Sequence, residues 1–398
     1  MELSEVLYLI GQWSGFLALV SLAFLIFSGD TARFTDRFFG LDRIIKFQRK
    51  FSFLSFAFLF LHPIFFILSG QSFANYFIPA FYALPLAFGT LAFYVFIAVM
   101  FFSYFYKRIS YKAWQYIHVL TYLLFFAALY HAFFWGSHSD KLFFIISYII
   151  LIVAVFVGAV YRTLYKIKEK RLGAAEVIYV KWENDDVFTV AIKTKQVLKF
   201  RAGQFCFLRL DGRKLYARHP FTISSAPQDD ELLFTVKNTG RFTSALSGLK
   251  AGDKINIDGP FGRFVEKVGR NEMVFIAGGV GITPFRSLIR DLLKKNMSAK
   301  ISLIYCAKKE KDLVFRNEFE ALKSDRFNST YVLSHEEKDC PGTCRGFLSS
   351  EIIKASLNGV KAPLFYICGP VQMKKAAKEI IKSLGLPKDD IIVEDFFW

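Results

Sequence analysis

The sequence predicts a chain of three parts: a bundle of membrane-spanning α-helices, then a small antiparallel β-barrel, then an α/β domain. Three observations carry this prediction. Long apolar runs without charge are confined to about the first 171 residues, and short strands broken by Gly, Pro and Asp follow. A buried strand, a glycine turn and an amphipathic helix then occupy residues 273–293. We place the boundaries at 1–168, 169–268 and 269–398.

The apolar runs of the first part predict five membrane spans. Each run is near or above the roughly 18 residues that a spanning helix needs. The start MELSE is acidic, and no small-residue cleavage motif follows the first run, so we expect that run to stay in the protein as a helix. The five runs cover residues 6–27, 51–68, 81–105, 114–135 and 142–161.

Charge in the connecting segments predicts the orientation of these spans. The segments 29–50 and 106–113 are rich in Lys and Arg, whereas 69–80 carries no charge and 136–141 only one of each sign. By the positive-inside rule the N-terminus lies outside and everything after the fifth span is cytoplasmic. Many of the basic residues behind the net charge of +17 flank these spans or lie in YRTLYKIKEKR just past the last one, so we expect a lipid bilayer and no nucleic acid as partner.

The cysteines lie in the predicted cytoplasmic half, where thiols stay reduced. No second pair accompanies the CPGTC string, so its two cysteines are expected to be free thiols and not metal ligands. The five are Cys206, Cys306, Cys340, Cys344 and Cys368.

Three histidines lie inside the apolar runs: His62 in the second, His118 and His131 in the fourth. One such histidine often only bonds a neighbouring helix, but three without acidic or thiol partners suit axial ligation of haem iron. His118 and His131 are 13 residues apart, which is about 20 Å along a helix and leaves room for two haems. The ideal helix turns their side chains about 140° apart, so the helix or the approach of the haems must differ from ideal.

The string WQYIHVLTYLLFFAALYH, residues 114–131, resembles the ferric-reductase-like transmembrane domain shared by NADPH oxidases and ferric-chelate reductases. The resemblance implies two helices that each carry two haem-ligating histidines, with His62 paired to His131 near the outer face. The partner of His118 would fall at position 48, where this chain has Gln48. The resemblance therefore implies haem b, either one or two per chain. His138, in an outer loop, is expected to be solvated.

The barrel contains the string RHPFTISSAP, residues 218–227, which resembles the flavin-binding motif of the ferredoxin-NADP reductase superfamily. By that resemblance His219, Pro220 and Phe221 form a wall of an FAD site, and Thr222 donates to the flavin ring. An arginine can bind pyrophosphate with two hydrogen bonds. The further FAD contacts that the resemblance implies are Arg218, Ser225, Lys237, Thr243 and Ser244.

The string AGGVGITP opens the last part and resembles the NAD(P)H motif of the same superfamily, with a Rossmann-like domain behind it. A glycine turn before a helix lets backbone amides approach phosphate. FYICGP places Cys368 near the nicotinamide, and the terminal Trp398 would cover the flavin. The implied nucleotide contacts are Gly278, Gly279, Gly281, Thr283, Pro284, Cys368, Gly369, Pro370 and Trp398.

The motifs arrive in the order of a bacterial NADPH oxidase, and this resemblance implies an enzyme. NAD(P)H would reduce FAD, haem would carry electrons across the membrane, and dioxygen would become superoxide. Thr222, Cys368 and Trp398 are the expected catalytic residues. A ferric-chelate reductase and an electron conduit to a protein or quinone remain alternatives. We expect no obligatory protein partner, and the choice between NADPH and NADH stays open.

Overall fold

The structure is a computed structural model of the 398-residue chain. It describes residues 2–105, 111–136, 139–172, 175–210, 219–295, 298–337, 340–357 and 363–394. Two compact units divide the chain, Met1–Arg171 and Leu172–Trp398. Each unit is described by itself below.

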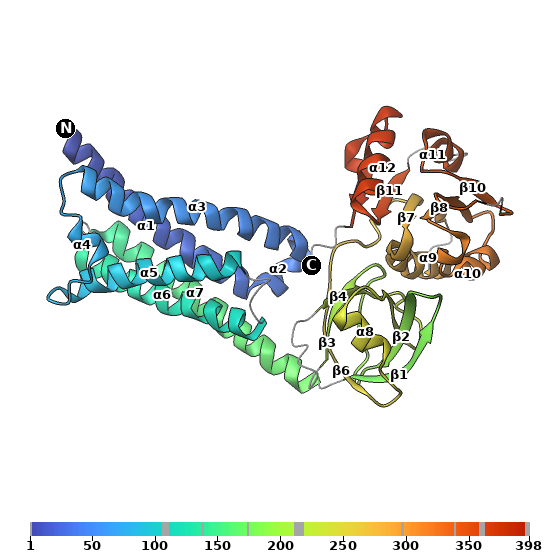
Figure 1. Ribbon diagram of the computed structural model, residues 1–398, viewed down its shortest axis with the longest axis horizontal. Helices are drawn as coiled ribbons and strands as arrows, with labels where there is room; N and C mark the ends of the chain where they lie inside the picture. The colour runs from blue at the N-terminus through green and yellow to red at the C-terminus, as the bar shows by residue number, and fades with distance from the viewer. Residues whose placement is uncertain are drawn as a thin grey trace. The chain divides into compact units, whose positions relative to one another are not determined.

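The first unit is helical, and its long helices run along one another (Figure 1). Four of the five predicted apolar runs lie wholly on helices, and the run 81–105 lies on α5 except at its ends. Among the described residues, α1, α3, α5 and α7 are long and apolar enough to cross a membrane, and α6 has a shorter apolar stretch, Val119–Trp135. The helices are α1 (Leu3–Asp30), α2 (Ala32–Phe39), α3 (Leu41–Leu68), α4 (Ala74–Phe77), α5 (Leu84–Tyr104), α6 (Tyr111–Trp135) and α7 (Leu142–Leu172).

One polar network ties three of these helices together. Asp30, at the end of α1, is buried and accepts a hydrogen bond of 2.6 Å from the Tyr122 hydroxyl on α6. Arg162 on α7 pairs with the same carboxylate at 3.2 Å and donates to the Tyr122 hydroxyl at 3.3 Å. A buried carboxylate needs such partners, because an unpaired charge in a low-dielectric interior is costly. The network fixes how α1, α6 and α7 pack at this end of the bundle.

The second unit begins with the predicted antiparallel sheet. Its strands follow the order β4-β3-β6-β1-β2-β5, and a bridge between Ile223 and Phe234 joins the two edge strands. The edges thus meet, and the apolar side chains turned inward form one core. The elements are β1 (Ala175–Trp182), β2 (Val187–Lys193), β3 (Phe205–Arg209), β4 (His219–Thr222), β5 (Leu232–Lys237), α8 (Arg241–Ser247) and β6 (Lys254–Phe261).

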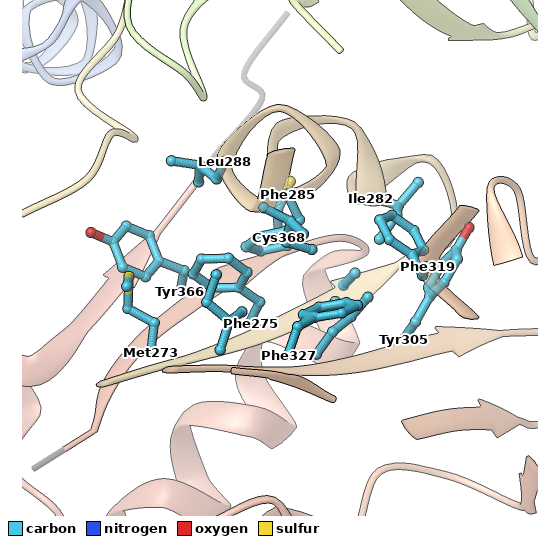
Figure 2. Packing of buried hydrophobic residues seen from close by; sticks show 14 of the residues in the cluster. Met273, Phe275, Ile282, Phe285, Leu288, Tyr305, Phe319, Phe327, Tyr366 and Cys368 are labelled. Carbon is cyan, nitrogen blue, oxygen red and sulfur yellow. The ribbon is translucent and has the colours of Figure 1, made fainter. Parts of the chain in front are cut away.

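The rest of the second unit is an α/β domain around a parallel sheet in the order β10-β9-β8-β7-β11-β12. Residues of β7 and α9 pack on one another in its core, and Figure 2 shows Phe275 and Phe285 there. The strands are β7 (Glu272–Gly278), β8 (Lys300–Ala307), β9 (Phe327–Leu333), β10 (Thr343–Arg345), β11 (Leu364–Cys368) and β12 (Ile391–Val393). The helices are η2 (Gly279–Ile282), α9 (Thr283–Lys295), η3 (Glu310–Asp312), α10 (Arg316–Ala321), α11 (Ser350–Ser356), α12 (Val371–Ser383) and η4 (Lys388–Asp390).

Candidate functional site

Two of the three membrane histidines meet inside the helical bundle. His62 on α3 and His131 on α6 have ring centroids 6.2 Å apart, and their ring planes are nearly perpendicular, at 85°. Sequence separation does not predict this contact, because 69 positions divide the two residues. The structure therefore brings together the pair that the sequence resemblance expects.

Each of these rings is held by the backbone of a neighbouring helix. Nδ1 of His62 lies 2.9 Å from the carbonyl oxygen of Gly11, and Nδ1 of His131 lies 2.9 Å from that of Pro85. A carbonyl only accepts, so Nδ1 carries the proton in both rings and Nε2 of each neutral imidazole keeps its lone pair. Protein metal sites use this arrangement to orient a ligating histidine. Both rings are thus prepared to bind a metal through Nε2.

Two helical glycines make room for the rings. A Cβ added to Gly15 on α1 would lie 2.6 Å from Cε1 of His62, and one added to Gly89 on α5 would lie 2.5 Å from Nδ1 of His131. Each glycine comes four residues after the carbonyl that its histidine bonds. The two histidines are therefore held in the same way on two different helix pairs. Sequence reasoning missed both glycines; the only signal was a small residue inside an apolar run.

The histidines line one cavity of about 670 Å³. This volume is within the usual range for a cofactor site. Most of the lining is apolar, and the polar exceptions besides the histidines include Gln12, Gln71, Asn75, Ser139 and Lys141. The described residues hold no cluster of three or more His, Cys, Asp or Glu side chains that could bind a metal. The two imidazoles in this apolar cavity offer two nitrogen ligands to a bound group.

The structure shows no second pair of ligands among the residues that it describes. His118 lies on α6, but its side chain is outside the described residues, as are Ser137 and His138. Gln48 on α3 donates from Nε2 to the Ser28 hydroxyl at 3.0 Å. The structure thus assembles one histidine pair from residues that it describes.

The predicted flavin strand is β4, which pairs with β3 at one side of the barrel sheet. His219 and Phe221 face the same way, and both contact the Phe242 ring, with centroids 4.2 and 5.9 Å from it. Pro220 and the buried Thr222 alternate to the opposite face. The predicted wall of three residues is therefore divided between the two faces of the strand. Arg218 lies outside the described residues.

The predicted phosphate contacts gather around one turn of the barrel. Lys237 pairs with Asp186 at 2.9 Å, and the Thr243 hydroxyl accepts from the backbone N–H of Gly240 at 2.9 Å. The Ser244 hydroxyl donates to Oδ1 of Asn238 at 2.8 Å. Each side chain has a partner within the protein, so contact with FAD stays a prediction for all three.

Acidification is expected to weaken the barrel through His219. Burial lowers the pKa of His219 below its usual value of 6.5, so the folded chain keeps this ring neutral where the unfolded chain protonates it. Stability should therefore fall as the pH drops below about 6.5. The melting temperature, followed by flavin fluorescence, should decrease from pH 7.5 to 5.5, and less so in His219→Gln. An equal decrease in both proteins would contradict this role, and His335→Gln, at an exposed position, is the control.

The predicted nucleotide turn follows β7, the strand at which the order of strand addition in the parallel sheet reverses. The chain adds β8 on one side of β7 and later returns to add β11 on the other side. Crevices at the carboxyl ends of such strands are the usual ligand sites of open α/β sheets. Gly278 ends β7, η2 contains Gly279 and Gly281, and α9 begins at Thr283.

Close packing explains the glycines at this edge. A Cβ on Gly281 would lie 2.5 Å from the carbonyl oxygen of Cys368, and one on Gly278 would lie 2.7 Å from Cδ of Pro370. Gly369 has φ +157°, and a Cβ added to it would lie 3.0 Å from the α-carbon of Gly278. The structure thus brings the predicted nucleotide residues of two distant strings together. Cys368 itself is fully buried in the core of the domain (Figure 2), and its catalytic role stays a prediction.

The segment after β12 is anchored at the same edge. Glu394 donates its N–H to the carbonyl of Ile367 at 3.0 Å, and its own carbonyl accepts from Nζ of the buried Lys374 at 3.0 Å. Glu394 is thus bound to the carboxyl end of β11 and to α12. Trp398 is outside the described residues, so its place over the flavin stays a prediction.

Helix α9 connects the nucleotide edge with the barrel. The Ser287 hydroxyl donates to the Ser225 carbonyl at 2.6 Å, and Arg290 binds both carboxylate oxygens of Asp229, at 3.0 and 3.1 Å. The Ser225 side chain is fully buried and accepts from the N–H of Leu233. Ser225 therefore lies at the contact between barrel and α/β domain, and its predicted contact with FAD is not tested by this arrangement.

Comparison with protein families gives three matches in sequence. Residues 14–129 match the ferric reductase like transmembrane component, 172–264 match an FAD-binding domain, and 275–379 match an oxidoreductase NAD-binding domain. The chain is also similar to one component of the Na⁺-translocating NADH-quinone reductase from Haemophilus ducreyi and Actinobacillus pleuropneumoniae. Each is 35% identical over 164 residues, which cover 39% of this chain and 40% of the relative. The match thus spans about two fifths of these relatives.

Solved structures agree with the fold of the second unit. A ferredoxin NADP⁺ reductase from Neisseria gonorrhoeae has a TM-score of 0.51 at 21% identity and covers 56% of this chain and 98% of its own. The cytochrome b5 reductase domain of Ulva prolifera nitrate reductase has a TM-score of 0.51 at 22% identity and covers 56% and 96%. The predicted fold class is confirmed: a helical bundle is followed by an antiparallel flavin-type barrel and a Rossmann-like domain.

Proposed function

We propose that this flavin-dependent oxidoreductase with a ferric reductase-like transmembrane domain is an NAD(P)H oxidase that reduces dioxygen to superoxide across the membrane. The observation that carries the proposal is the histidine pair, because His62 and His131 offer two free Nε2 atoms to one apolar cavity. These two residues would hold haem b through their Nε2 atoms, and the haem would supply one-electron transfer.

The chain's own residues supply binding and position. When bound, flavin turns the two electrons of a nicotinamide into single electrons, and haem b carries those singly. The glycines at the carboxyl ends of β7 and β11, Gly278, Gly281 and Gly369, would let the nucleotide approach the backbone, and β4 would hold the flavin. One NAD(P)H then supplies electrons for two dioxygen molecules and leaves one proton on the side of the dehydrogenase unit. We place that unit in the cytoplasm, from the basic segments 29–50 and 106–113.

The cavity lining supports a small acceptor. Apolar residues surround the histidines, and among the described lining residues there is no carboxylate and Lys141 is the one cation. A positive charge in the lining favours an anionic product such as superoxide. A ferric chelate or a quinone would use the same electron path and differ only at this last step.

The test is a reduced-minus-oxidised spectrum of the detergent-purified full chain, with haem and FAD counted per chain. NADPH or NADH is then added in air with a superoxide-specific trap. Haem, FAD and trapped product that superoxide dismutase removes would support the proposal. Nucleotide oxidation without trapped product, but with reduction of ferric citrate or a quinone under argon, would favour the alternatives. A chain that binds no haem would refute all three.

Adding a methyl group to either glycine is expected to impair haem binding. In Gly15→Ala or Gly89→Ala the new Cβ would displace the imidazole from its carbonyl, and the loss of such an orienting bond usually costs about 10–100-fold in metal affinity. Haem content after titration with haemin would measure the loss. Gly29→Ala is the matched control, because its Cβ would be 3.9 Å from the nearest atom. An equal loss in the control would disprove the specific role of the two glycines.

Removing the terminal ring is expected to affect the dehydrogenase half alone. Trp398→Ala should leave the haem spectrum intact and change nicotinamide binding by about 2- to 12-fold, since a stacked aromatic contact is worth about 0.5–1.5 kcal/mol. Stopped-flow reduction of FAD at several NADPH and NADH concentrations would measure the change. Trp398→Phe, which keeps a ring, should retain wild-type values. Identical kinetics in all three proteins would exclude stacking.

A further inference from the structure

The contact that holds His62 is repeated along the same two helices. Gly29 lies fourteen residues after Gly15 on α1, and Gln48 lies fourteen residues before His62 on α3. Fourteen residues are about four turns, so each pair returns to nearly the same face of its helix about 21 Å away. A Cβ on Gly29 would have Nε2 of Gln48 as its nearest neighbour, at 3.9 Å. Gln48 thus takes the place that His62 has in the first contact.

The backbone acceptor of this second contact is already used. In the first contact the carbonyl four residues before the glycine, that of Gly11, holds the imidazole. The corresponding carbonyl is that of Leu25, and it accepts a bond of 3.2 Å from the Ser28 hydroxyl. Ser28 in turn accepts from Nε2 of Gln48 at 3.0 Å. A chain of two hydrogen bonds therefore replaces the single bond of the first contact.

We infer that Gln48 joins α3 to α1 through a hydrogen bond to Ser28 and does not bind iron. Of the two repeated contacts between α1 and α3, only the one at His62 then supplies an iron ligand. The inference rests on the proposed haem function. A carboxamide whose amino group is bound to Ser28 is oriented by α1, and it is a poor iron ligand beside imidazole. In place of a second ligand, this chain thus has two hydrogen bonds, from Gln48 to Ser28 and from Ser28 to the Leu25 carbonyl.

The inference predicts that a histidine ligand can be restored. In Gln48→His an imidazole needs the Leu25 carbonyl, which Ser28 occupies, so Ser28→Ala must accompany it. The double variant Q48H/S28A should bind about one more low-spin haem per chain than the wild type after titration with haemin. His118, thirteen residues before His131, is the expected partner. Adding His118→Ala should therefore remove the gain.

The loss variant makes the opposite prediction. Q48A should keep the wild-type number of haems and the wild-type low-spin optical and electron paramagnetic resonance signals. Its melting temperature should fall by about 2–4 °C, because one hydrogen bond between helices is lost. S28A should show at least the same fall, because it removes the bond to Leu25 as well as the bond from Gln48. Q48A/S28A should fall no further than S28A, since the bond from Gln48 is already lost there.

Each outcome decides the inference. Unchanged haem in Q48A together with a gain in Q48H/S28A supports it. Loss of haem or a high-spin signal in Q48A would show that Gln48 binds iron and would overturn it. So would the lack of a gain in Q48H/S28A. If the wild-type chain binds haem and the His62 variant does not, the haem site of the proposed function stands whatever position 48 does; if the wild type binds none, both fail.

Discussion

Under the proposed haem function, His62→Ala and His131→Ala should each abolish the haem absorbance and leave the flavin in place, which is the largest effect that we expect. Both rings line the same cavity, and each offers one Nε2 to it. A bis-histidine haem that loses one axial ligand loses the low-spin spectrum, and affinity should fall more than the roughly 10–100-fold seen when only an orienting partner is removed. We expect haem content below about a tenth of wild type.

The measurement is pyridine haemochrome and FAD content per chain in detergent, with melting temperature as a check on folding. His335→Ala, an exposed histidine of the other unit, is the matched control. His62→Gly offers a sharper test, because added imidazole can enter the space left by the side chain. Return of the low-spin spectrum with imidazole would identify position 62 as a ligand. Wild-type haem content in both alanine variants would disprove the assignment.

Gly281→Ala is expected to have the second largest effect, on hydride transfer. Its Cβ would meet the Cys368 carbonyl oxygen at 2.5 Å and the Gly369 α-carbon at 3.0 Å. Both obstacles are backbone, so the turn and the end of β11 must move apart by about 1 Å. A misplacement of that size can cost about 100-fold in rate. Reduction of FAD by NADPH or NADH should slow by about this factor.

Single-turnover reduction of FAD by stopped flow would measure the rate, and dithionite reduction of the haem should stay normal. Gly248→Ala is a suitable control, because its Cβ would make only ordinary contacts of 3.7 and 3.8 Å. A wild-type rate in Gly281→Ala would mean that the nucleotide binds elsewhere on the α/β domain.

The fold class was predictable because each part has its own periodicity. Uncharged runs near helix-spanning length, short strands with turn residues, and a strand before a glycine turn each need only local sequence. The match of His62 with His131 and the clustering of the two glycine strings followed from resemblance, and the structure brings both sets together.

What the sequence did not predict are contacts between helices that lie far apart in the chain. Gly15 and Gly89 belong to no motif, and their role depends on which helix faces each histidine. Gln48 could be recognised as a departure, but its bond to Ser28 depends on the antiparallel register of α1 and α3. The sequence also did not predict that His219 and Phe221 share the Phe242 ring as a neighbour, and the contact of this strand with FAD stays a prediction.

Helix α9 also has a consequence for where a mutation is felt. The helix begins at Thr283, beside the nucleotide turn, and one to two turns later Ser287 and Arg290 bind the flavin barrel. A single helix thus joins the proposed nucleotide site to the proposed flavin site. A substitution that shifts α9 is therefore expected to disturb both sites at once, so a slower reduction of FAD does not by itself identify which of the two has changed.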